Sequence, residues 1–355
     1  MTALAAILAR RIAAMGPMTL ADYMAECLLN PDHGYYATRD PFGAAGDFTT
    51  APEISQMFGE LLGLWLAQCW LDQGAPRQFV LAEIGPGRGT LMADILRATA
   101  RLPGFSDAAR PHLVEASAHL RAVQRQTLGD RPVVWHDRIE ALPQAPLFLV
   151  ANEFFDALPI RQFQRAQRGW RERVVALDGN GALTLALAPA TGFAALDHRL
   201  ADTVPGDIVE TCAAALPIVA EIGTRIARHG GAALIVDYGG WRSRGDTFQA
   251  LAAHRPVDPL AAPGQADLTA HVDFEALARA ADPARVSPLV TQGALLERLG
   301  IGTRAEALAQ NLTGEVLASH RAAYRRLTHP QEMGNLFKAM ALTQATAPLP
   351  PGFAP

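Results

Sequence analysis

One stretch near the first quarter of the chain constrains the fold more than any other. Residues 79–84 form an apolar run of strand length, and Gly85, Gly87 and Gly89 follow at alternate positions. From residue 91 to residue 100 the apolar side chains return at helical spacing. Glycine permits a positive φ and lets a ligand approach the backbone, and the amides that open a helix favour an anionic group. The stretch therefore predicts a strand, a tight turn and a helix. The turn either binds a ligand or serves as structural punctuation only.

The spacing of the glycines and one acid before them narrow the choice of ligand. A dinucleotide fingerprint reads G-x-G-x-x-G, whereas the third glycine here comes one residue early. Glu83 precedes the first glycine by two residues. A carboxylate there is unhelpful to a pyrophosphate but suits a ligand that carries an ammonium beside its carboxylate, as S-adenosylmethionine (SAM) does. The pattern E-x-G-x-G-x-G resembles the first motif of class I SAM-dependent methyltransferases, and it disfavours a nicotinamide dehydrogenase.

Strand-like and helix-like segments then alternate as far as residue 159. Further apolar runs lie at 112–114, 132–135 and 147–151. Such alternation predicts a parallel sheet with helices on its faces, whose ligand lies beyond the carboxyl ends of the strands. Each predicted strand ends in an acid, and these are Glu83, Glu115, Asp137, and Glu153 with Asp156. We therefore expect several carboxylates to gather at one edge of the sheet.

The remaining segments predict additions to this sheet. We expect an N-terminal helical segment over 1–75 and a Rossmann-like α/β domain over 76–355, with insertions at about 160–210 and 240–283. Short alternating runs in the first insertion predict an antiparallel ribbon. The second insertion contains a long irregular stretch rich in Pro, Gly, Asp and His, which predicts a lid that faces the substrate.

Composition excludes several classes of function. The chain has 355 residues, half of them hydrophobic, which predicts a globular protein with a large core. Its net charge of −4, without a basic cluster, gives no support to nucleic-acid binding. The three cysteines are widely spaced and predict a reducing compartment rather than disulfides. No apolar run reaches transmembrane length and no grouping has metal-ligand spacing, so we expect neither a membrane span nor a metal.

Motifs across nearly the whole chain resemble those of the MidA-like family of SAM-dependent methyltransferases, which includes the mitochondrial complex I assembly methyltransferase. The matching pieces are Asn30-Pro31, His33-Gly34-Tyr35-Tyr36, the run Gly46 to Ser55, Glu83 to Thr90, the run Asn152 to Pro159, Asp237-Tyr238-Gly239, Pro263-Gly264 and Asp267-Leu268-Thr269. One departure is Glu210-Thr211-Cys212, where an acid followed by Ser-Pro is expected.

The resemblance implies a class I methyltransferase fold and SAM as the methyl donor. For the mitochondrial member it implies symmetric dimethylation of an arginine in a complex I subunit, so a protein substrate of the complex I 49-kDa type is expected. We expect a cytoplasmic protein if the source is bacterial and a matrix protein if it is eukaryotic. A small-molecule O- or N-methyltransferase and a SAM-binding assembly factor without turnover remain alternatives.

The predicted cofactor site combines the strand-end acids with family motifs. Glu83 and the glycine loop are expected to bind the methionine part of SAM. Glu115 is expected to accept from the ribose hydroxyls, although an acid at a helix N-terminus would look the same. Asp137 contacts the adenine amino group or is a loop carboxylate. The family motifs add Gly46, Asp47, Thr49 and Asn152.

Glu153 and Asp156 are the predicted catalytic residues. A guanidinium stays protonated in proteins, with a pKa above roughly 12, so a methyltransferase that acts on arginine must bind the cation and remove a proton. Two carboxylates can bind one guanidinium bidentately. Their three-residue spacing would place both beside the methyl group if the turn after strand 147–151 is helical. Asp237 and Asp267 are second candidates, and the alternative for Glu153 is a helix cap.

Overall fold

The computed structural model describes residues 2–38 and 49–353. The chain forms two compact units. Unit 1 comprises Met1–Phe48, Asp156–Leu216 and Gly240–Asp273, and unit 2 comprises Thr49–Phe155, Pro217–Gly239 and Phe274–Pro355. This division differs from the expected boundary at residue 75. The helices after Thr49 cluster with the glycine motif, whereas the first insertion and most of the second cluster with the N-terminal helices.

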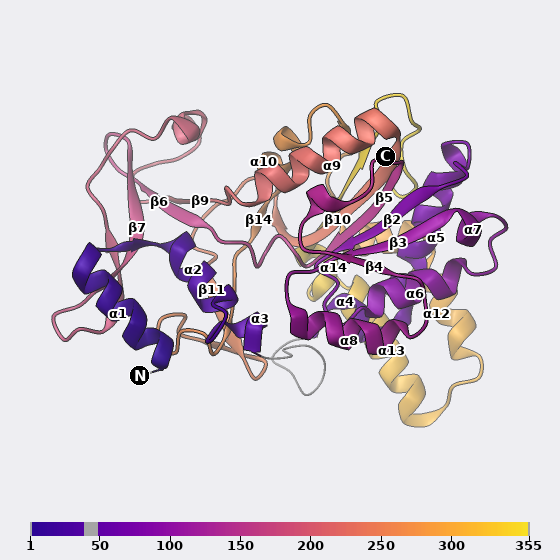
Figure 1. The fold of residues 1–355 in the computed structure, drawn as a ribbon, viewed down its shortest axis with the longest axis horizontal. Helices are drawn as coiled ribbons and strands as arrows, with labels where there is room; N and C mark the ends of the chain where they lie inside the picture. Colours follow the sequence, from indigo (N-terminus) through magenta and orange to yellow (C-terminus); the bar gives the residue numbers. More distant parts are fainter. Residues whose placement is uncertain (1, 39–48, 354–355) are drawn as a thin grey trace. The chain divides into compact units, whose positions relative to one another are not determined.

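A mostly parallel sheet forms the centre of unit 2 (Figure 1). Its parallel strands are β2 (Phe79–Ile84), β3 (Ala109–Val114), β4 (Val134–His136), β5 (Leu147–Asn152) and β10 (Gly231–Gly240). An antiparallel edge is added by β15 (Arg285–Val286), β16 (Val290–Thr291) and β17 (Phe337–Thr343). The strand order β15-β17-β10-β5-β2-β3-β4 reverses direction at β2. This strand order is that of a doubly wound sheet, and the predicted α/β, Rossmann-like class I fold is confirmed. Sheets of this kind bind their ligand where the order reverses.

Helices cover both faces of this sheet. In Figure 1, α6 (Thr90–Thr99) and α8 (Ala118–Leu128) run along one side and α9 (Ala215–His229) along the other. Two helices precede β2: α4 (Ala51–Ile54) ends at Ser55, which is extended, and α5 (Gln56–Asp72) begins after it. The Ser55 hydroxyl accepts from the Met57 amide and so caps α5. The other helices of unit 2 are α7 (Phe105–Ala108), η1 (Ile139–Ala141), α10 (Phe274–Ala280), α11 (Gln292–Arg298), α12 (Ile301–Ala309), α13 (Gly314–Thr328) and α14 (Met333–Leu336).

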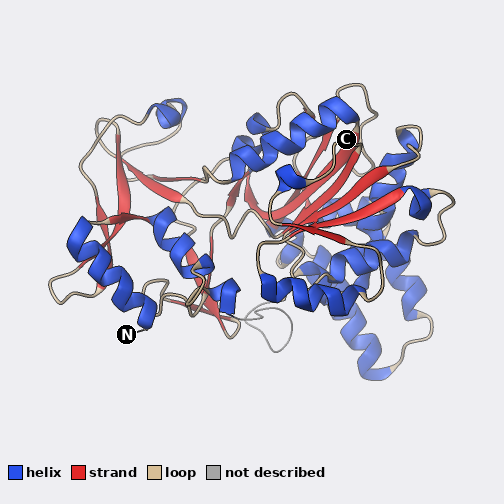
Figure 2. Cartoon of the chain, in the orientation of Figure 1, coloured by secondary structure: helices blue, strands red, loops and turns tan. Residues whose placement is uncertain are grey.

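Unit 1 has its own antiparallel sheet and its own core (Figure 2). The predicted ribbon is present as β6 (Arg161–Arg165), β7 (Trp170–Leu177) and β8 (Leu183–Leu187), and the sheet also contains β1 (Met18–Thr19) and β9 (Ile208–Thr211). The helices are α1 (Ala3–Met15), α2 (Leu20–Leu29), α3 (Tyr35–Thr38) and η2 (Ala194–Arg199). Leu4, Leu8 and Ile12 recur at helical spacing and form the buried face of α1.

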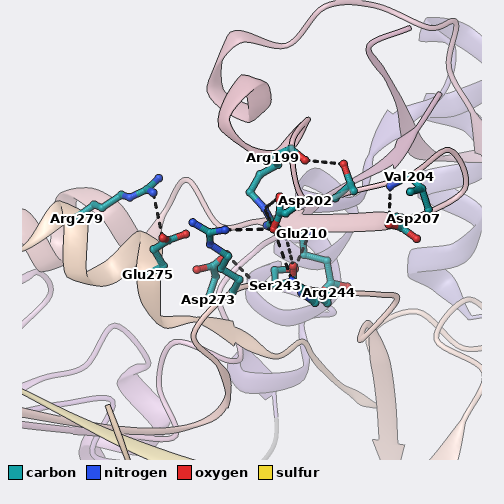
Figure 3. Close-up of polar contacts among 12 residues, drawn as sticks. Arg199, Asp202, Val204, Asp207, Glu210, Ser243, Arg244, Asp273, Glu275 and Arg279 are labelled. Carbon is teal, nitrogen blue, oxygen red and sulfur yellow. Dashed lines mark hydrogen bonds and ion pairs between the residues drawn. The ribbon is translucent and has the colours of Figure 1, made fainter. Parts of the chain in front are cut away.

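The stretch expected as an irregular lid contains a second small sheet of unit 1. Its strands are β11 (Gln249–Ala252), β12 (Arg255–Val257) and β13 (Asp267–Thr269). Glu210, the acid that precedes the departure at Thr211-Cys212, anchors this stretch, because its buried carboxylate accepts from the Thr247 amide at 2.9 Å and from Gln162 Nε2 at 2.7 Å. Buried Arg199 donates to the Ser243 carbonyl at 2.9 Å (Figure 3). Both contacts tie the stretch to the antiparallel sheet and its flanking helix.

Candidate active site

The glycine turn after β2 requires glycine at each of its three positions. Gly85, Gly87 and Gly89 have φ values of 64°, 50° and 82°, a region that side chains with a Cβ rarely adopt. A Cβ added to Gly85 would lie 2.6 Å from the Phe154 ring. Gly89 is the N-cap of α6. The turn therefore presents backbone to any ligand that lies against it, as the sequence predicts.

Glu83 ends β2 as a buried acid with one oxygen lacking a partner. Its side chain is only 3% exposed, and Oε2 has no hydrogen-bond partner among the described residues. Burial raises the pKa of the Glu83 carboxyl to about 8, although a hydrogen bond with the Met92 backbone opposes this shift. A buried polar atom without a partner is costly. An ammonium group placed here would supply the missing donor, so Glu83 fits the amino-acid end of SAM.

Asn152, at the end of the neighbouring strand β5, offers a second such oxygen. Glu83 pairs with Val150 in the sheet, and Asn152 lies two residues beyond Val150, so its side chain is on the same face as Glu83. Asn152 Oδ1 is buried without a partner among the described residues, while Nδ2 donates to Glu153 Oε1 at 3.0 Å. The ends of β2 and β5 therefore present two unpartnered oxygens on one face of the sheet.

Glu115 follows β3 and is held on both sides of its carboxylate. Oε1 accepts from the Ser117 amide at 2.7 Å, and Oε2 accepts from Gln124 Nε2 at 3.3 Å. Burial raises the pKa of Glu115 above its ordinary value. Ser117 is the N-cap of α8, so Glu115 lies beside a helix N-terminus. This position is also compatible with a contact between Glu115 and the ribose hydroxyls.

Asp137, after β4, is placed differently from the other strand-end acids. Its side chain is 79% exposed and forms an ion pair with Arg121 Nη2 at 2.6 Å. Arg121 Nε also donates to the Glu115 carbonyl at 2.7 Å. Asp137 is thus linked through Arg121 to the neighbouring strand end, and its adenine contact stays a prediction.

Glu153 follows β5 in an unusual backbone conformation. Its φ is 50°, and no helix lies between β5 and β6, so the helical turn that would place Glu153 and Asp156 together by their spacing is absent. The reason is local: Asp237 Oδ2 accepts from the Phe154 and Phe155 amides at 3.2 and 2.9 Å, which fixes a turn there. Glu153 Oε1 accepts from the Ala51 amide at 2.9 Å. Glu153 therefore caps the separate helix α4, and Asp237 shapes the turn that follows β5.

Asp156 begins the next segment of unit 1 and is 7% exposed. Its carbonyl accepts from the Ala270 amide at 3.0 Å. Within the same unit Tyr36 donates its hydroxyl to Asp267 Oδ1 at 2.7 Å. Burial first, and then the charges of Asp267 and Asp156, raise the pKa of Tyr36. Both charges thus act on the Tyr36 hydroxyl, and Asp267, the second candidate, is the acid that accepts its hydrogen bond.

The family loop before α5 is described only in part. Gly46 and Asp47 lie outside the described residues. The Thr49 carbonyl accepts from Arg326 Nη2 at 3.5 Å. Further along, the Glu53 carboxylate accepts from the hydroxyl of Thr90, the first residue of α6. The described part of the loop therefore contacts the helix that follows the glycine turn.

Gln124 is a residue of this site that the sequence analysis missed. It lies on α8 and is fully buried, and it contacts both the glycine turn and Glu115. Leu120, Gln124 and Leu128 recur at four-residue spacing on the buried face of α8. A polar residue within an apolar stripe is the signal that would have revealed it.

No group of three or more His, Cys, Asp or Glu side chains in the described part of the chain is arranged to hold a metal ion. Among the helices of residues 2–38 and 49–353, none has the length and apolar character needed to cross a membrane.

Comparison with known proteins identifies the family to which this chain belongs. The model of a family of S-adenosyl-L-methionine-dependent methyltransferases matches residues 61–291. The mitochondrial protein arginine methyltransferase NDUFAF7 of Danio rerio is 40% identical over 93% of this chain and 84% of its own length. The chain belongs to this SAM-dependent methyltransferase family. SAM is its methyl donor.

Other members of the methyltransferase family agree with this assignment. Human mitochondrial NDUFAF7 is 38% identical over 94% of this chain and 81% of its own length. A crystal structure of a COG1565 superfamily member from Burkholderia thailandensis, with S-adenosyl-homocysteine bound, superposes with a TM-score of 0.86. That structure is 34% identical and covers 99% of this chain and 94% of its own. The chain therefore shares its whole fold with a methyltransferase-family protein that binds the product of SAM.

Proposed function

We propose that this methyltransferase transfers the methyl group of SAM to an arginine side chain of a protein. The observation that carries the proposal is the match, over more than nine-tenths of the chain, to relatives named protein arginine methyltransferase. The acids at the strand ends support it, because a cationic guanidinium requires anionic partners. By the same resemblance, a complex I subunit of the 49-kDa type is the proposed substrate. The proposed compartment is the cytoplasm in a bacterium and the mitochondrial matrix in a eukaryote.

Most of the residues proposed to hold the cofactor belong to unit 2. Glu83 and the glycine turn bind its amino-acid part, and Glu115 binds the ribose hydroxyls. Asp137 is proposed for the adenine amino group, and Asn152 contributes its unpartnered Oδ1. Gly46, Asp47 and Thr49 are proposed to complete the site on the strength of the family motif. When bound, SAM supplies an electrophilic methyl group.

Glu153 and Asp156 are the proposed catalytic carboxylates. They are three residues apart, so the chain keeps their Cα atoms within about 11 Å of each other. Hydrogen bonds from Ala51 and Asn152 to Glu153 Oε1 orient its carboxylate. Carboxylates that bind two guanidinium nitrogens hold the positive charge there and leave the third nitrogen closer to a neutral amine. The same carboxylates then accept the proton that the methylated nitrogen loses.

A methylation assay with matched variants tests the proposal. The purified protein is incubated with isotopically labelled SAM and the 49-kDa-type subunit, and methylarginine is mapped by mass spectrometry. We expect Asp156→Asn and Glu153→Gln to lower the rate at least about a hundredfold, with SAM affinity, measured by calorimetry, within about threefold of wild type. Glu140→Gln, which changes an exposed acid of η1, should leave both quantities unchanged.

Three outcomes separate the alternatives. If wild-type protein binds SAM and yields no methylarginine, the proposed substrate is wrong. Methylation of small amines or hydroxyls without methylation of the protein would favour a small-molecule methyltransferase. If Asp156→Asn loses SAM affinity together with activity, Asp156 belongs to the cofactor site and its catalytic role is wrong.

A further inference from the structure

One buried amide links separate parts of the cofactor site. The Gln124 side chain is 0% exposed. Its Nε2 donates to the Gly87 carbonyl at 2.8 Å and to Glu115 Oε2 at 3.3 Å. Its Oε1 accepts from Trp135 Nε1 at 2.8 Å. The glycine turn after β2, the acid after β3 and an aromatic side chain of β4 are therefore joined through a single amide.

The chemistry of these contacts fixes the orientation of the amide. A primary amide has two N–H donors and an acceptor oxygen. Both donors face oxygen atoms and the acceptor faces an indole N–H, so every contact is satisfied in one orientation. A flipped amide would place its oxygen against two oxygens and its NH2 group against the Trp135 donor. The Gln124 amide thus has one stable orientation, and it fixes the positions of the groups to which it is hydrogen-bonded.

The aliphatic part of Gln124 also packs on the turn. A Cβ added to Gly89 would lie 3.5 Å from Gln124 Cγ, so the chain of Gln124 lies against the bare backbone of the third glycine. The amide head and the aliphatic stem therefore contact two different glycines of the same turn. A side chain that only filled space in the core would not need the hydrogen bonds to Gly87, Glu115 and Trp135.

We infer that Gln124 is a positioning residue for SAM: it sets the distance between the glycine turn that receives the methionine part and the carboxylate that receives the ribose. The inference rests on the cofactor site assigned under Proposed function. Because a pre-organised site binds without reordering its own groups, loss of this link should weaken SAM binding even though Gln124 is not assigned a contact with SAM.

The main test compares Gln124→Met with Gln73→Met. Methionine keeps the length and the apolar stem of glutamine but makes none of the three hydrogen bonds. Gln73 is a matched control in unit 2, since its amide donates to the Gly231 carbonyl at 3.0 Å and accepts from the Gly231 amide at 2.8 Å at the start of β10. We expect Gln124→Met to raise the SAM dissociation constant about tenfold. Gln73→Met should lower the melting temperature without changing SAM affinity.

A double-mutant cycle with Glu115→Gln distinguishes positioning from general destabilisation. If Gln124 acts through Glu115, the two substitutions together should weaken SAM binding by less than the product of their separate effects. Gln124→Glu gives a second variant in case Gln124→Met does not fold. Its carboxylate would face Glu115 and the Gly87 carbonyl, so affinity should fall below that of wild type at pH 8. That deficit relative to wild type should shrink as the pH is lowered and the new acid regains a donor.

Two results would overturn the inference in different ways. A Gln124→Met protein that binds SAM within twofold of wild type, or a cycle whose effects multiply, would show that Gln124 does not act through Glu115. If Glu83→Gln and Glu115→Gln both bind SAM as wild type does, the cofactor site itself is misassigned. In that case the proposed function loses its site, and the inference is overturned with it.

Discussion

At the scale of single residues, the proposed role of Glu83 would couple cofactor binding to protonation. Its carboxyl is buried at the end of β2, one oxygen has no partner among the described residues, and its pKa is raised to about 8. At neutral pH the free protein therefore holds this group largely protonated. An arriving ammonium stabilises the charged form and lowers the pKa again. SAM binding should release a proton from Glu83 at pH 7.

The prediction for this residue is a pH-dependent affinity that Glu83→Gln abolishes. Wild-type affinity for SAM should rise with pH up to about 8, and calorimetry at pH 7 should show a heat that depends on the ionisation enthalpy of the buffer. Glu83→Gln should bind SAM roughly 10- to 100-fold more weakly, since a charged hydrogen bond is lost, with no such buffer dependence. Equal affinity of the two proteins at every pH would contradict the role of Glu83.

The same residue sets a pH dependence of stability with the opposite sign. Because the folded-state pKa exceeds the ordinary value of 4.5, the free folded protein retains a proton that the unfolded chain loses. The contribution of Glu83 to stability is therefore fully present below about pH 4.5 and is lost as the pH rises to about 8. Without SAM, the melting temperature of Glu83→Gln should rise relative to that of wild type as the pH increases from about 4.5 to about 8.

At the scale of elements, the end of β10 shapes the turn that follows β5. Asp237 is fully buried, and its Oδ2 accepts from the amides of Phe154 and Phe155. Its Oδ1 accepts from the Tyr238 amide at 2.9 Å. One carboxylate thus satisfies backbone donors of two strand ends, which explains how Glu153 is held in its left-handed conformation.

We expect Asp237→Asn to damage catalysis more than cofactor binding. The substitution replaces one accepting oxygen with a donor, so a backbone amide loses its partner at a cost of about 1–3 kcal/mol. The turn that carries Glu153 should shift, and kcat should fall more than about tenfold while SAM affinity changes less than about threefold. Steady-state kinetics, calorimetry and thermal melting check this. A variant with a normal melting temperature and wild-type kcat would contradict it.

At the scale of the whole molecule, each unit has its own hydrophobic core. Leu8 of α1 belongs to the core of unit 1 and Leu62 of α5 to that of unit 2, and both are fully buried. A chain with separate cores need not unfold in a single step. SAM binding should mainly stabilise unit 2, to which most of its proposed site residues belong.

Paired core substitutions test this division. Leu8→Ala and Leu62→Ala should each cost about 2–5 kcal/mol and lower different transitions in calorimetric melting. Saturating SAM should raise the temperature of the transition that Leu62→Ala lowers, and it should leave the temperature of the other transition unchanged. If both variants and SAM move one common transition, the chain unfolds as a single cooperative body.

The sequence predicts the elements of this protein better than their grouping. The glycine turn and the ribbon strands are found where their local patterns place them, because those patterns depend on neighbours a few residues apart. The clustering of residues 1–48 with distant insertions depends on contacts such as that of the Tyr23 hydroxyl with the Pro259 carbonyl. Such contacts leave no periodic signal in either segment.

The site shows the same limit. Glu83 and Glu115 occupy the predicted strand ends, since strand direction alone fixes those positions. The positive φ of Glu153 was not predictable from its residue type. It arises from amides that bind Asp237, a residue more than eighty positions away. Gln124 was missed for a related reason, as its partners come from separate strands.

Unit 1 is assembled from segments that lie far apart in the sequence, and this affects its folding during synthesis on the ribosome. The helices α1 and α2 emerge before the rest of unit 1, yet α1 packs on β7 and α2 on β13, which ends at Thr269. At about 5–20 residues per second, roughly 10–50 s pass between the appearance of α2 and that of β13. Until β7 and β13 have emerged, the apolar faces of the two helices lack part of their native cover. Nascent chains of this protein should therefore be clients of chaperones that hold exposed helices near the tunnel exit.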